Sequence, residues 1–183
     1  AVQFGISQKY KETTGATFIE NNDLKLDVSV KGIDKIEFLI STNPGEELKP
    51  LASIASGGEI SRIMLALKKL LAFTDKVPVM VFDEIDIGIS GRIAQAVGKS
   101  LRSLAATPQI ICITHLPQIA SLAHHHYLVE KSSNGDITQT NIRKLSLDER
   151  TEQVASLFGG ESVTEAHLKS ASELIQESEN LAN

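Results

Sequence analysis

The chain has 183 residues, a length that suits one well-buried domain and makes two domains unfavourable. Hydrophobic residues make up 42% and the net charge is −5, values that exclude a disordered or fibrous protein and predict no basic patch for direct DNA binding. No segment approaches the run of about 18 apolar residues that a membrane span needs. Because the first residues also do not resemble a signal peptide, we expect a soluble, intracellular protein without a membrane partner.

Residues 1–50 show the alternation and the turns of β structure. The segments Asn21-Asn22-Asp23 and Lys31-Gly32 are typical turns between strands. We therefore predict an antiparallel β region with strands at Val2–Ile6, Thr17–Glu20, Leu24–Val30 and Ile36–Ser41.

Residues 54–71 form a small-residue turn, Ser56-Gly57-Gly58, that runs into an amphipathic helix. The free N–H groups at the start of such a helix, together with two glycines, would suit a bound phosphate. Ser56 and Glu59 also have the spacing of a plain capping box, and these residues alone leave that alternative open. Arg62 falls on the polar side of the helix, opposite the apolar residues Ile60, Ile63, Met64, Leu67, Leu70 and Leu71.

The next segments alternate between strand and helix, which predicts a parallel sheet covered by helices and an α/β fold. The segments Val77–Phe82 and Gln109–Thr114 are apolar runs suited to buried strands. Between them, residues 92–104 predict a helix with one apolar side: Ile93, Ala94, Val97, Leu101 and Leu104. After these come a short helix from Pro117, a hairpin around Ser132–Gly135, and helices at 147–158 and 163–181.

Acidic residues and a histidine follow the two predicted strands. Asp83 and Glu84 come directly after the first strand, and His115 closes the second. Because the carboxyl ends of parallel strands meet at one edge, where α/β sheets bind ligands, we expect these side chains along that edge. Taken singly, an exposed acidic turn and a hydrogen-bonded structural histidine are the plainer readings.

Four motifs in this order carry a family resemblance: Ala55–Arg62, Phe82–Glu84, Ile87–Gly91 and Thr114–Ala120. Together they resemble the ATP-binding-cassette superfamily, in the branch that includes the SMC chromosome proteins. Within that branch the pattern is most similar to the RecN family of bacterial DNA-repair proteins. The strand and turn at 33–46 and the tail around Phe158–Gly160 also look like that family.

The resemblance implies ATP and Mg²⁺ as ligands and assigns a role to each motif. Asp83 would support Mg²⁺ through its water shell, Glu84 would polarise the attacking water, and His115 would sense the γ-phosphate. The signature residues Ser56, Gly57, Gly58 and Glu59 would contact the nucleotide held by a second head. Ser90 and Gly91 stand in the D-loop, which crosses the dimer interface in related ATPases. Many relatives have an acidic residue where this chain has Ser90, which puts in doubt any D-loop contact that needs a carboxylate.

The sequence contains no G-x-x-x-x-G-K-[ST] motif and no sustained heptad pattern. The resemblance therefore implies the C-terminal lobe of a split ATPase head, whose N-terminal lobe comes from the distant start of the same polypeptide. We expect a single domain, 1–183, with a β-rich region (1–50), a core (51–145) and C-terminal helices (146–183). Alone, this lobe is expected to be inactive.

The leading hypothesis is a RecN-type ATPase for recombinational repair of DNA double-strand breaks, in which ATP is held between two heads and hydrolysis releases the dimer. DNA would be reached through the intact protein, in the cytoplasm at the nucleoid. An ATP-gated structural clamp with incidental turnover is the alternative, and a transporter ATPase is disfavoured.

Three other features point to structure rather than to chemistry. Gly98-Lys99-Ser100 resembles the end of a P-loop, but Ile93 replaces the required glycine, so we expect helix surface. His124-His125-His126 would point alternately to opposite faces of a strand, which disfavours a metal site. Cys112 lies in an apolar run and is expected to be a small buried hydrophobic residue.

Overall fold

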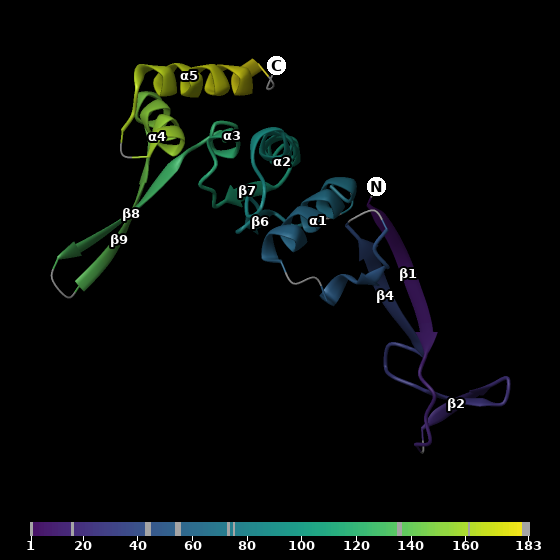
Figure 1. Cartoon of the computed structure of the whole chain (residues 1–183). Helices are drawn as coiled ribbons and strands as arrows, with labels where there is room; N and C mark the ends of the chain where they lie inside the picture. The colour runs from purple at the N-terminus through teal and green to yellow at the C-terminus, as the bar shows by residue number, and fades with distance from the viewer. Residues whose placement is uncertain are drawn as a thin grey trace. The chain divides into compact units, whose positions relative to one another are not determined.

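The computed structural model describes residues 2–15, 17–42, 45–53, 56–72, 74, 76–134, 137–160 and 162–180. The chain divides into two compact units, Ala1–Ser56 and Gly57–Asn183 (Figure 1). The expected α/β class is confirmed, since the chain combines a parallel strand pair, antiparallel strands and flanking helices. The single domain over residues 1–183, with its internal boundaries at 50 and 145, stays a prediction.

The first unit is antiparallel, as predicted, but its strands form two sheets. In one sheet β1 (Gln3–Tyr10) pairs with β4 (Asp34–Ser41), which pairs with β5 (Lys49–Pro50). In the other, β2 (Phe18–Asn21) pairs with β3 (Leu24–Asp27), and a 3₁₀ turn, η1 (Leu51–Ser53), ends the unit.

The turn between β2 and β3 explains why this hairpin is tight. Asn22 and Asp23 both have a left-handed backbone, with φ of 49° and 65°. Two central residues of this kind match the twist of paired strands, and Asn and Asp tolerate the conformation better than most side chains. The predicted turn at Asn21–Asp23 is therefore confirmed, whereas the strand after it is shorter than expected and ends at Asp27.

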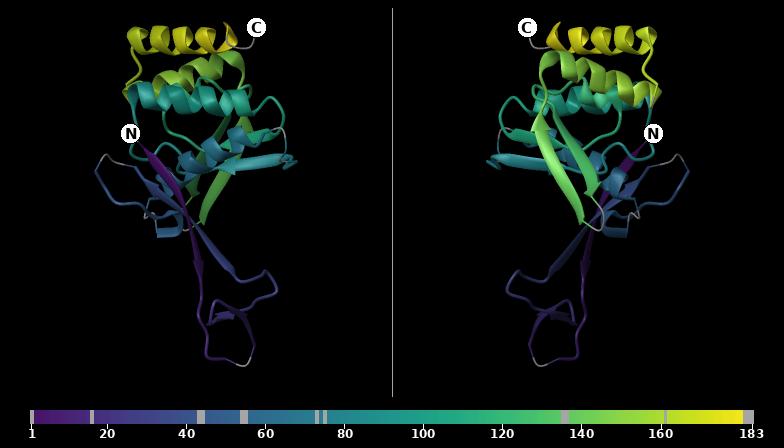
Figure 2. Two further views of the ribbon diagram at one scale, coloured as in Figure 1. Left: turned by 90° about the vertical axis from the view of Figure 1, so that its right-hand side faces the viewer. Right: turned by 90° about the vertical axis from the view of Figure 1, so that its left-hand side faces the viewer.

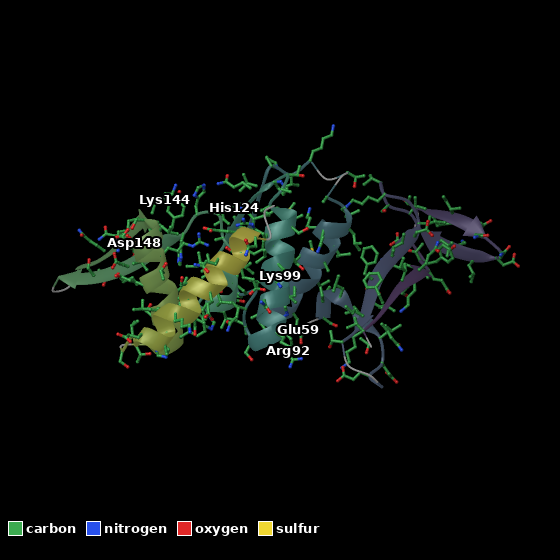
Figure 3. All side chains as sticks on the ribbon, turned by 90° about the horizontal axis from the view of Figure 1, so that it is seen from above. Glu59, Arg92, Lys99, His124, Lys144 and Asp148 are labelled. Atoms are coloured by element: carbon green, nitrogen blue, oxygen red, sulfur yellow. The ribbon has the colours of Figure 1, made fainter. Side chains whose placement is uncertain are left out.

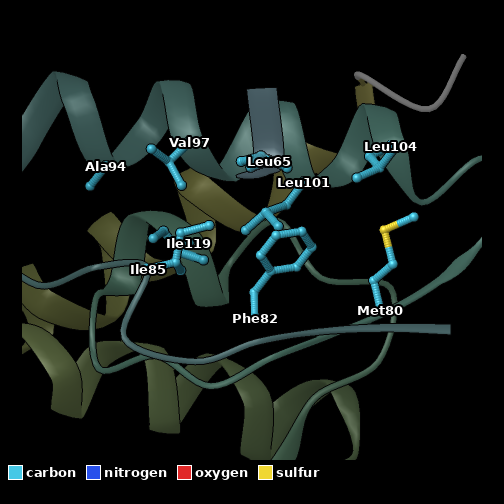
Figure 4. Packing of buried hydrophobic residues seen from close by; sticks show 9 residues of the cluster. All are labelled: Leu65, Met80, Phe82, Ile85, Ala94, Val97, Leu101, Leu104 and Ile119. Carbon is cyan, nitrogen blue, oxygen red and sulfur yellow. The ribbon is translucent and has the colours of Figure 1, made fainter. Parts of the chain in front are cut away.

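The second unit begins with the elements that hold its main core: α1 (Gly57–Leu70), β6 (Val79–Phe82), α2 (Gly91–Leu104), β7 (Gln109–Cys112) and α3 (Pro117–Ala120). Strands β6 and β7 are parallel, in a register that pairs Phe82 with Cys112. Side chains from the helices, from β6 and from the turn after β6 meet in one buried cluster (Figure 4): Leu65, Met80, Phe82, Ile85, Ala94, Val97, Leu101, Leu104 and Ile119. The predicted strand–helix alternation is confirmed.

Burial differs from the prediction at several positions in these elements, of which β6 and α2 give two examples. Strand β6 was expected to be buried on both faces, yet Val79 and Val81 are 43% and 63% exposed, because the core packs only on the face of Met80 and Phe82. In α2, Ile93 is 59% exposed. One residue occupies about 100° of a helix, so Ile93 lies beside the stripe that Ala94 begins rather than on it.

The second unit ends in a hairpin and two helices, as predicted. Strands β8 (Tyr127–Asn134) and β9 (Ile137–Lys144) pair antiparallel, so Ser132–Asn134, which were predicted in the turn, belong to β8 instead. Helix α5 (Glu165–Asn180) lies along α4 (Leu147–Gly159), and Figure 2 shows them stacked. A second buried cluster joins these helices to α3: Ala120, Val154, Ala155, Ala171 and Ile175. The predicted end of the last helix at Leu181 lies outside the described residues.

A capping box starts α4. The backbone N–H of Ser146 donates to Oε2 of Glu149 at 2.8 Å, and the Glu149 N–H donates to Oγ of Ser146 at 3.4 Å. Arg143 donates to the other oxygen of Glu149 at 2.6 Å. These bonds favour the ionised carboxylate and lower the pKa of Glu149 to about 2. The backbone hydrogen bond from Ser146 makes the largest contribution to this shift.

Replacing the cap by Ser146→Ala should lower the free energy of unfolding by about 1 kcal/mol, the usual cost of a lost N-cap. The pKa of Glu149 in the folded state is below its ordinary value. The ionised Glu149 therefore stabilises the fold at pH values above the ordinary pKa, and this stabilisation is lost as the pH falls towards about 2. Urea denaturation at neutral pH measures the loss. Ser103→Ala, an exposed serine inside α2, is the control and should not destabilise the chain.

No helix in the described ranges is both long enough and apolar enough to cross a membrane.

Candidate functional site

The acidic residues and the histidine emerge at one edge of the parallel pair, as predicted. The backbone N–H of Ile113 donates to the carbonyl of Phe82 at 3.0 Å, which continues the β6–β7 pairing to the last residue of β6. Asp83 and Glu84 follow β6, while Thr114 and His115 follow β7. Both segments therefore leave the sheet at its carboxyl end, where open α/β sheets bind ligands.

The backbone turns sharply between the two carboxylates. Oδ1 of Asp83 accepts a hydrogen bond of 2.8 Å from the N–H of Glu84. Glu84 itself has φ of 59°, a left-handed conformation that is uncommon outside glycine and costs on the order of 1 kcal/mol or more. Both side chains are exposed, so one carboxylate is free to face a hydrated cation while the other faces a water molecule. Backbone strain of this kind is concentrated at functional sites.

The start of α1 packs against this turn. A Cβ on Gly57 would overlap the carboxylate of Glu84. A Cβ on Gly58 would lie 2.9 Å from the carbonyl oxygen of Glu84 and 3.0 Å from that of Ile87. The two glycines of the signature are therefore the residues that let the backbone of α1 approach Glu84.

Two further side chains of α1, which the sequence did not single out, fasten the helix to the same turn. Oγ of Ser61 donates to the carbonyl of Asp83 at 3.0 Å. Nη1 of Arg62 donates to the carbonyls of Ile85 and Ile87 at 3.2 and 2.8 Å. Arg62 was expected on the polar side of the helix, but its long stem brings the guanidinium back onto the turn. The signal in the sequence was only that both residues end the motif Ala55–Arg62, which carries the family resemblance.

Gly58→Ala should lower the stability of the chain by about 1–3 kcal/mol, because the new methyl group meets two backbone carbonyls that cannot turn away. Gly57→Ala is the matched control. Its methyl group meets only the end of a flexible side chain, so it should cost much less while displacing the Glu84 carboxylate. Denaturant unfolding of both variants compares the two costs, and equal losses would contradict this account of the contact.

Asp86 connects the two sheet ends, although the sequence reasoning did not assign it a role. Its side chain is 4% exposed, and Oδ2 accepts hydrogen bonds from Oγ1 of Thr114 at 2.6 Å and from the N–H of His115 at 2.9 Å. Nδ1 of His115 lies 3.0 Å from the same oxygen, and the His115 side chain as a whole is 72% exposed. Burial by itself would raise the pKa of Asp86, but the bonds from Thr114 and His115 outweigh it and lower the pKa.

The remaining predicted site residues lie in the loop before α2 and in the first turn of α1. Ser90 is the N-cap residue of α2 with an extended backbone and no capping bond from its side chain, and Gly91 follows with φ of 51°. Glu59 lies in the first turn of α1, and Arg92 lies in that of α2 (Figure 3). Ser56 is the last residue of the first unit and directly precedes α1.

The structure brings some predicted residues together and leaves others apart. Gly57 and Gly58 meet Glu84, and Asp83 bonds to the backbone of Glu84. No hydrogen bond or ion pair in the described part of the chain joins His115 to Asp83 or Glu84. His115 is instead held by Asp86. The roles given to these residues from the family resemblance stay predictions.

Other candidates for chemistry have structural roles. Cys112 was expected to be buried but is only partly buried, and it packs against the core. Its burial raises the pKa of the thiol to about 12, which disfavours the reactive thiolate. Gly98 was expected on the helix surface but is buried, since a Cβ there would lie 2.6 Å from Cδ1 of Leu122 and 3.1 Å from the carbonyl of Gln118. The glycine thus allows α2 and α3 to pack closely. Among the described residues, no three or more His, Cys, Asp or Glu side chains are grouped to hold a metal.

The chain is an α/β protein in which acidic residues and the start of a helix lie at the carboxyl ends of two parallel strands. Open α/β sheets bind their ligands at this place. No family model matches the chain. The DNA repair protein RecN of Halalkalibacterium halodurans is 42% identical over 168 residues, which cover 91% of this chain and 30% of that protein. RecN of Vibrio cholerae is 45% identical, covering 79% of this chain and 26% of that protein. RecN of Xylella fastidiosa is 47% identical, covering 80% of this chain and 26% of that protein.

The chain therefore belongs to the RecN family and corresponds to its C-terminal part. It spans only 26–30% of the length of these relatives. A solved structure from work on ATP-driven dimerization and DNA-stimulated activation of SMC ATPases covers 70% of this chain and 75% of its own, at 20% identity and a TM-score of 0.45.

Proposed function

We propose that this chain is the C-terminal lobe of a RecN-type ATPase head, which acts in recombinational repair of DNA double-strand breaks. One observation carries the proposal: the glycines that begin α1 pack directly against Glu84, at the sheet edge that also presents Asp83 and His115. A helix N-terminus offers N–H groups to a phosphate, and a carboxylate beside it can act on a water molecule.

The side chains divide the work in this proposal. Asp83 supports Mg²⁺ through its water shell, and its carboxylate oxygens suit that hard cation. When bound, Mg²⁺ neutralises charge on the phosphates of ATP. Glu84 accepts a proton from the attacking water, and His115 donates or accepts a hydrogen bond at the γ-phosphate. Ser61 and Arg62 keep the turn that carries Asp83 and Glu84 against α1.

The proposal requires partners that this chain does not supply. The α- and β-phosphates need a P-loop, which we assign to the N-terminal lobe of the same polypeptide. The signature at Ser56, Gly57 and Gly58, with Glu59, would face ATP on a second head, and Ser90 and Gly91 would lie at the interface of that homodimer. The intact protein, rather than this acidic lobe, would contact DNA in the cytoplasm.

ATP hydrolysis and ATP-driven association of the full-length protein test the proposal together. We expect measurable turnover, stimulated by Mg²⁺, and association that follows ATP binding and ends with hydrolysis. Association that ATP drives without coupled turnover would favour a structural clamp instead. A full-length protein that neither hydrolyses ATP nor self-associates when ATP is added would overturn both the ATPase proposal and the clamp alternative.

The isolated chain, residues 1–183, should bind Mg-ATP with a dissociation constant of about 1 mM or weaker. This corresponds to a binding free energy of about 4 kcal/mol or less in magnitude. The adenine, ribose and α/β-phosphate contacts lie outside it in this proposal, and the water shell at Asp83 lacks the nucleotide oxygens that complete it. Calorimetric titration measures the affinity. Micromolar binding would show that the nucleotide site has been assigned to the wrong lobe.

A further inference from the structure

Asp86 is an acidic side chain that the proposed division of work leaves unused. It is buried beneath the edge that carries the candidate site, and one of its oxygens, Oδ2, contacts both Thr114 and His115. Two of these contacts are hydrogen bonds from Thr114 and from the backbone of His115. An ionised carboxylate that is buried without such donors is strongly disfavoured, so these contacts explain why Asp86 can stay ionised.

The third contact concerns the imidazole of His115. Nδ1 lies 3.0 Å from Oδ2 of Asp86. An unprotonated Nδ1 would place its lone pair against a carboxylate, which is repulsive, whereas a protonated Nδ1 is attracted to it. The neutral ring has one N–H, so a proton on Nδ1 leaves Nε2 as an acceptor. The side chain is 72% exposed, so the part of the ring away from Asp86 is accessible to a ligand.

We propose that Asp86 is a positioning residue for His115: its carboxylate keeps a proton on Nδ1, fixes the ring, and presents Nε2 at the sheet edge. This inference rests on the proposed function, because ATP hydrolysis is the reaction in which the oriented Nε2 would take part. As an acceptor, Nε2 can hold the water that Glu84 activates. Once protonated, the ring becomes a cation beside Asp86 and Nε2 can donate to a phosphate oxygen.

Asp86 also ties together the loops that follow β6 and β7, so a purely structural role is the competing explanation. Thr114 separates the two roles. Thr114→Val removes one bond to the same oxygen but leaves the carboxylate and the imidazole in place. Asp86→Asn keeps the shape of the side chain and removes its charge.

The first test reads the tautomer of His115 directly, in the 183-residue chain with ¹⁵N-labelled histidine at pH about 9, where imidazole rings are neutral. Long-range ¹H–¹⁵N spectra distinguish the protonated from the bare ring nitrogen. We expect the proton on Nδ1 in the unaltered chain and in Thr114→Val. A proton on Nε2 in the unaltered chain would overturn the proposal. This readout requires no ATP, so it stands even where the proposed ATPase activity fails.

The second test is a double-mutant cycle on ATP turnover by the full-length protein. We expect Asp86→Asn to lower kcat by about tenfold to a hundredfold, as for carboxylates that orient histidines elsewhere. In a protein that already carries His115→Ala, the same change should cost almost nothing further, because the ring it orients is absent. An equal loss in both backgrounds would show that Asp86 acts on stability alone and would overturn the proposal. Absence of turnover in the unaltered protein would instead count against the proposed function.

Discussion

Glu84→Gln in the full-length protein is expected to reduce ATP turnover by about a hundredfold to ten-thousandfold, the usual contribution of a general base. The amide keeps the shape of the carboxylate and the same left-handed backbone, so the contact with Gly57 and the fold should persist. ATP binding should also remain, because the groups that grip the nucleotide are elsewhere in the proposal. The ATP-bound dimer should therefore accumulate.

Single-turnover hydrolysis and sedimentation with ATP measure the two parts of this result. Glu152→Gln, an exposed carboxylate in α4, is the control and should behave as the unaltered protein does. Turnover that survives Glu84→Gln at its normal rate would remove Glu84 from the chemistry and leave the acidic edge as a solvated turn.

The elements that the sequence predicted well are those whose patterns are local. The helix from Gly57 to Leu70 follows from helical spacing, and the β2–β3 hairpin follows from turn residues that are adjacent in the sequence. The placement of Asp83 and His115 at the same sheet edge also follows, because it needs only the parallel order of two strands. The roles of these residues depend on ligands and remain predictions.

What the sequence could not predict depends on contacts between distant residues. The exposure of Val81 depends on which face of β6 the helices cover, and an apolar run does not encode that choice. The burial of Gly98 depends on α3, a separate element. Arg62 and Asp86 have polar side chains, which would ordinarily be expected on the surface. Only the fold shows that Arg62 donates to backbone carbonyls and that Asp86 contacts His115.

Ser56→Arg in the full-length protein is expected to abolish ATP-dependent association of heads. Ser56 directly precedes the first residue of α1, and the N–H groups at the start of a helix suit a phosphate. In the proposal that phosphate belongs to ATP on the second head, so a long side chain at Ser56 would fill the space it needs.

The expected loss is clearest in the Glu84→Gln background, which should hold the dimer long enough for sedimentation with ATP to resolve it. Ala52→Arg is the control, since it adds the same charge and bulk at an exposed position of η1 just before the signature. ATP binding by each head should survive both changes, because Ser56 serves the opposite nucleotide. If heads carrying Ser56→Arg still associate with ATP as the control does, the residues that begin α1 do not contact the second nucleotide. The packing of Gly57 against Glu84 would then be a feature of the fold alone.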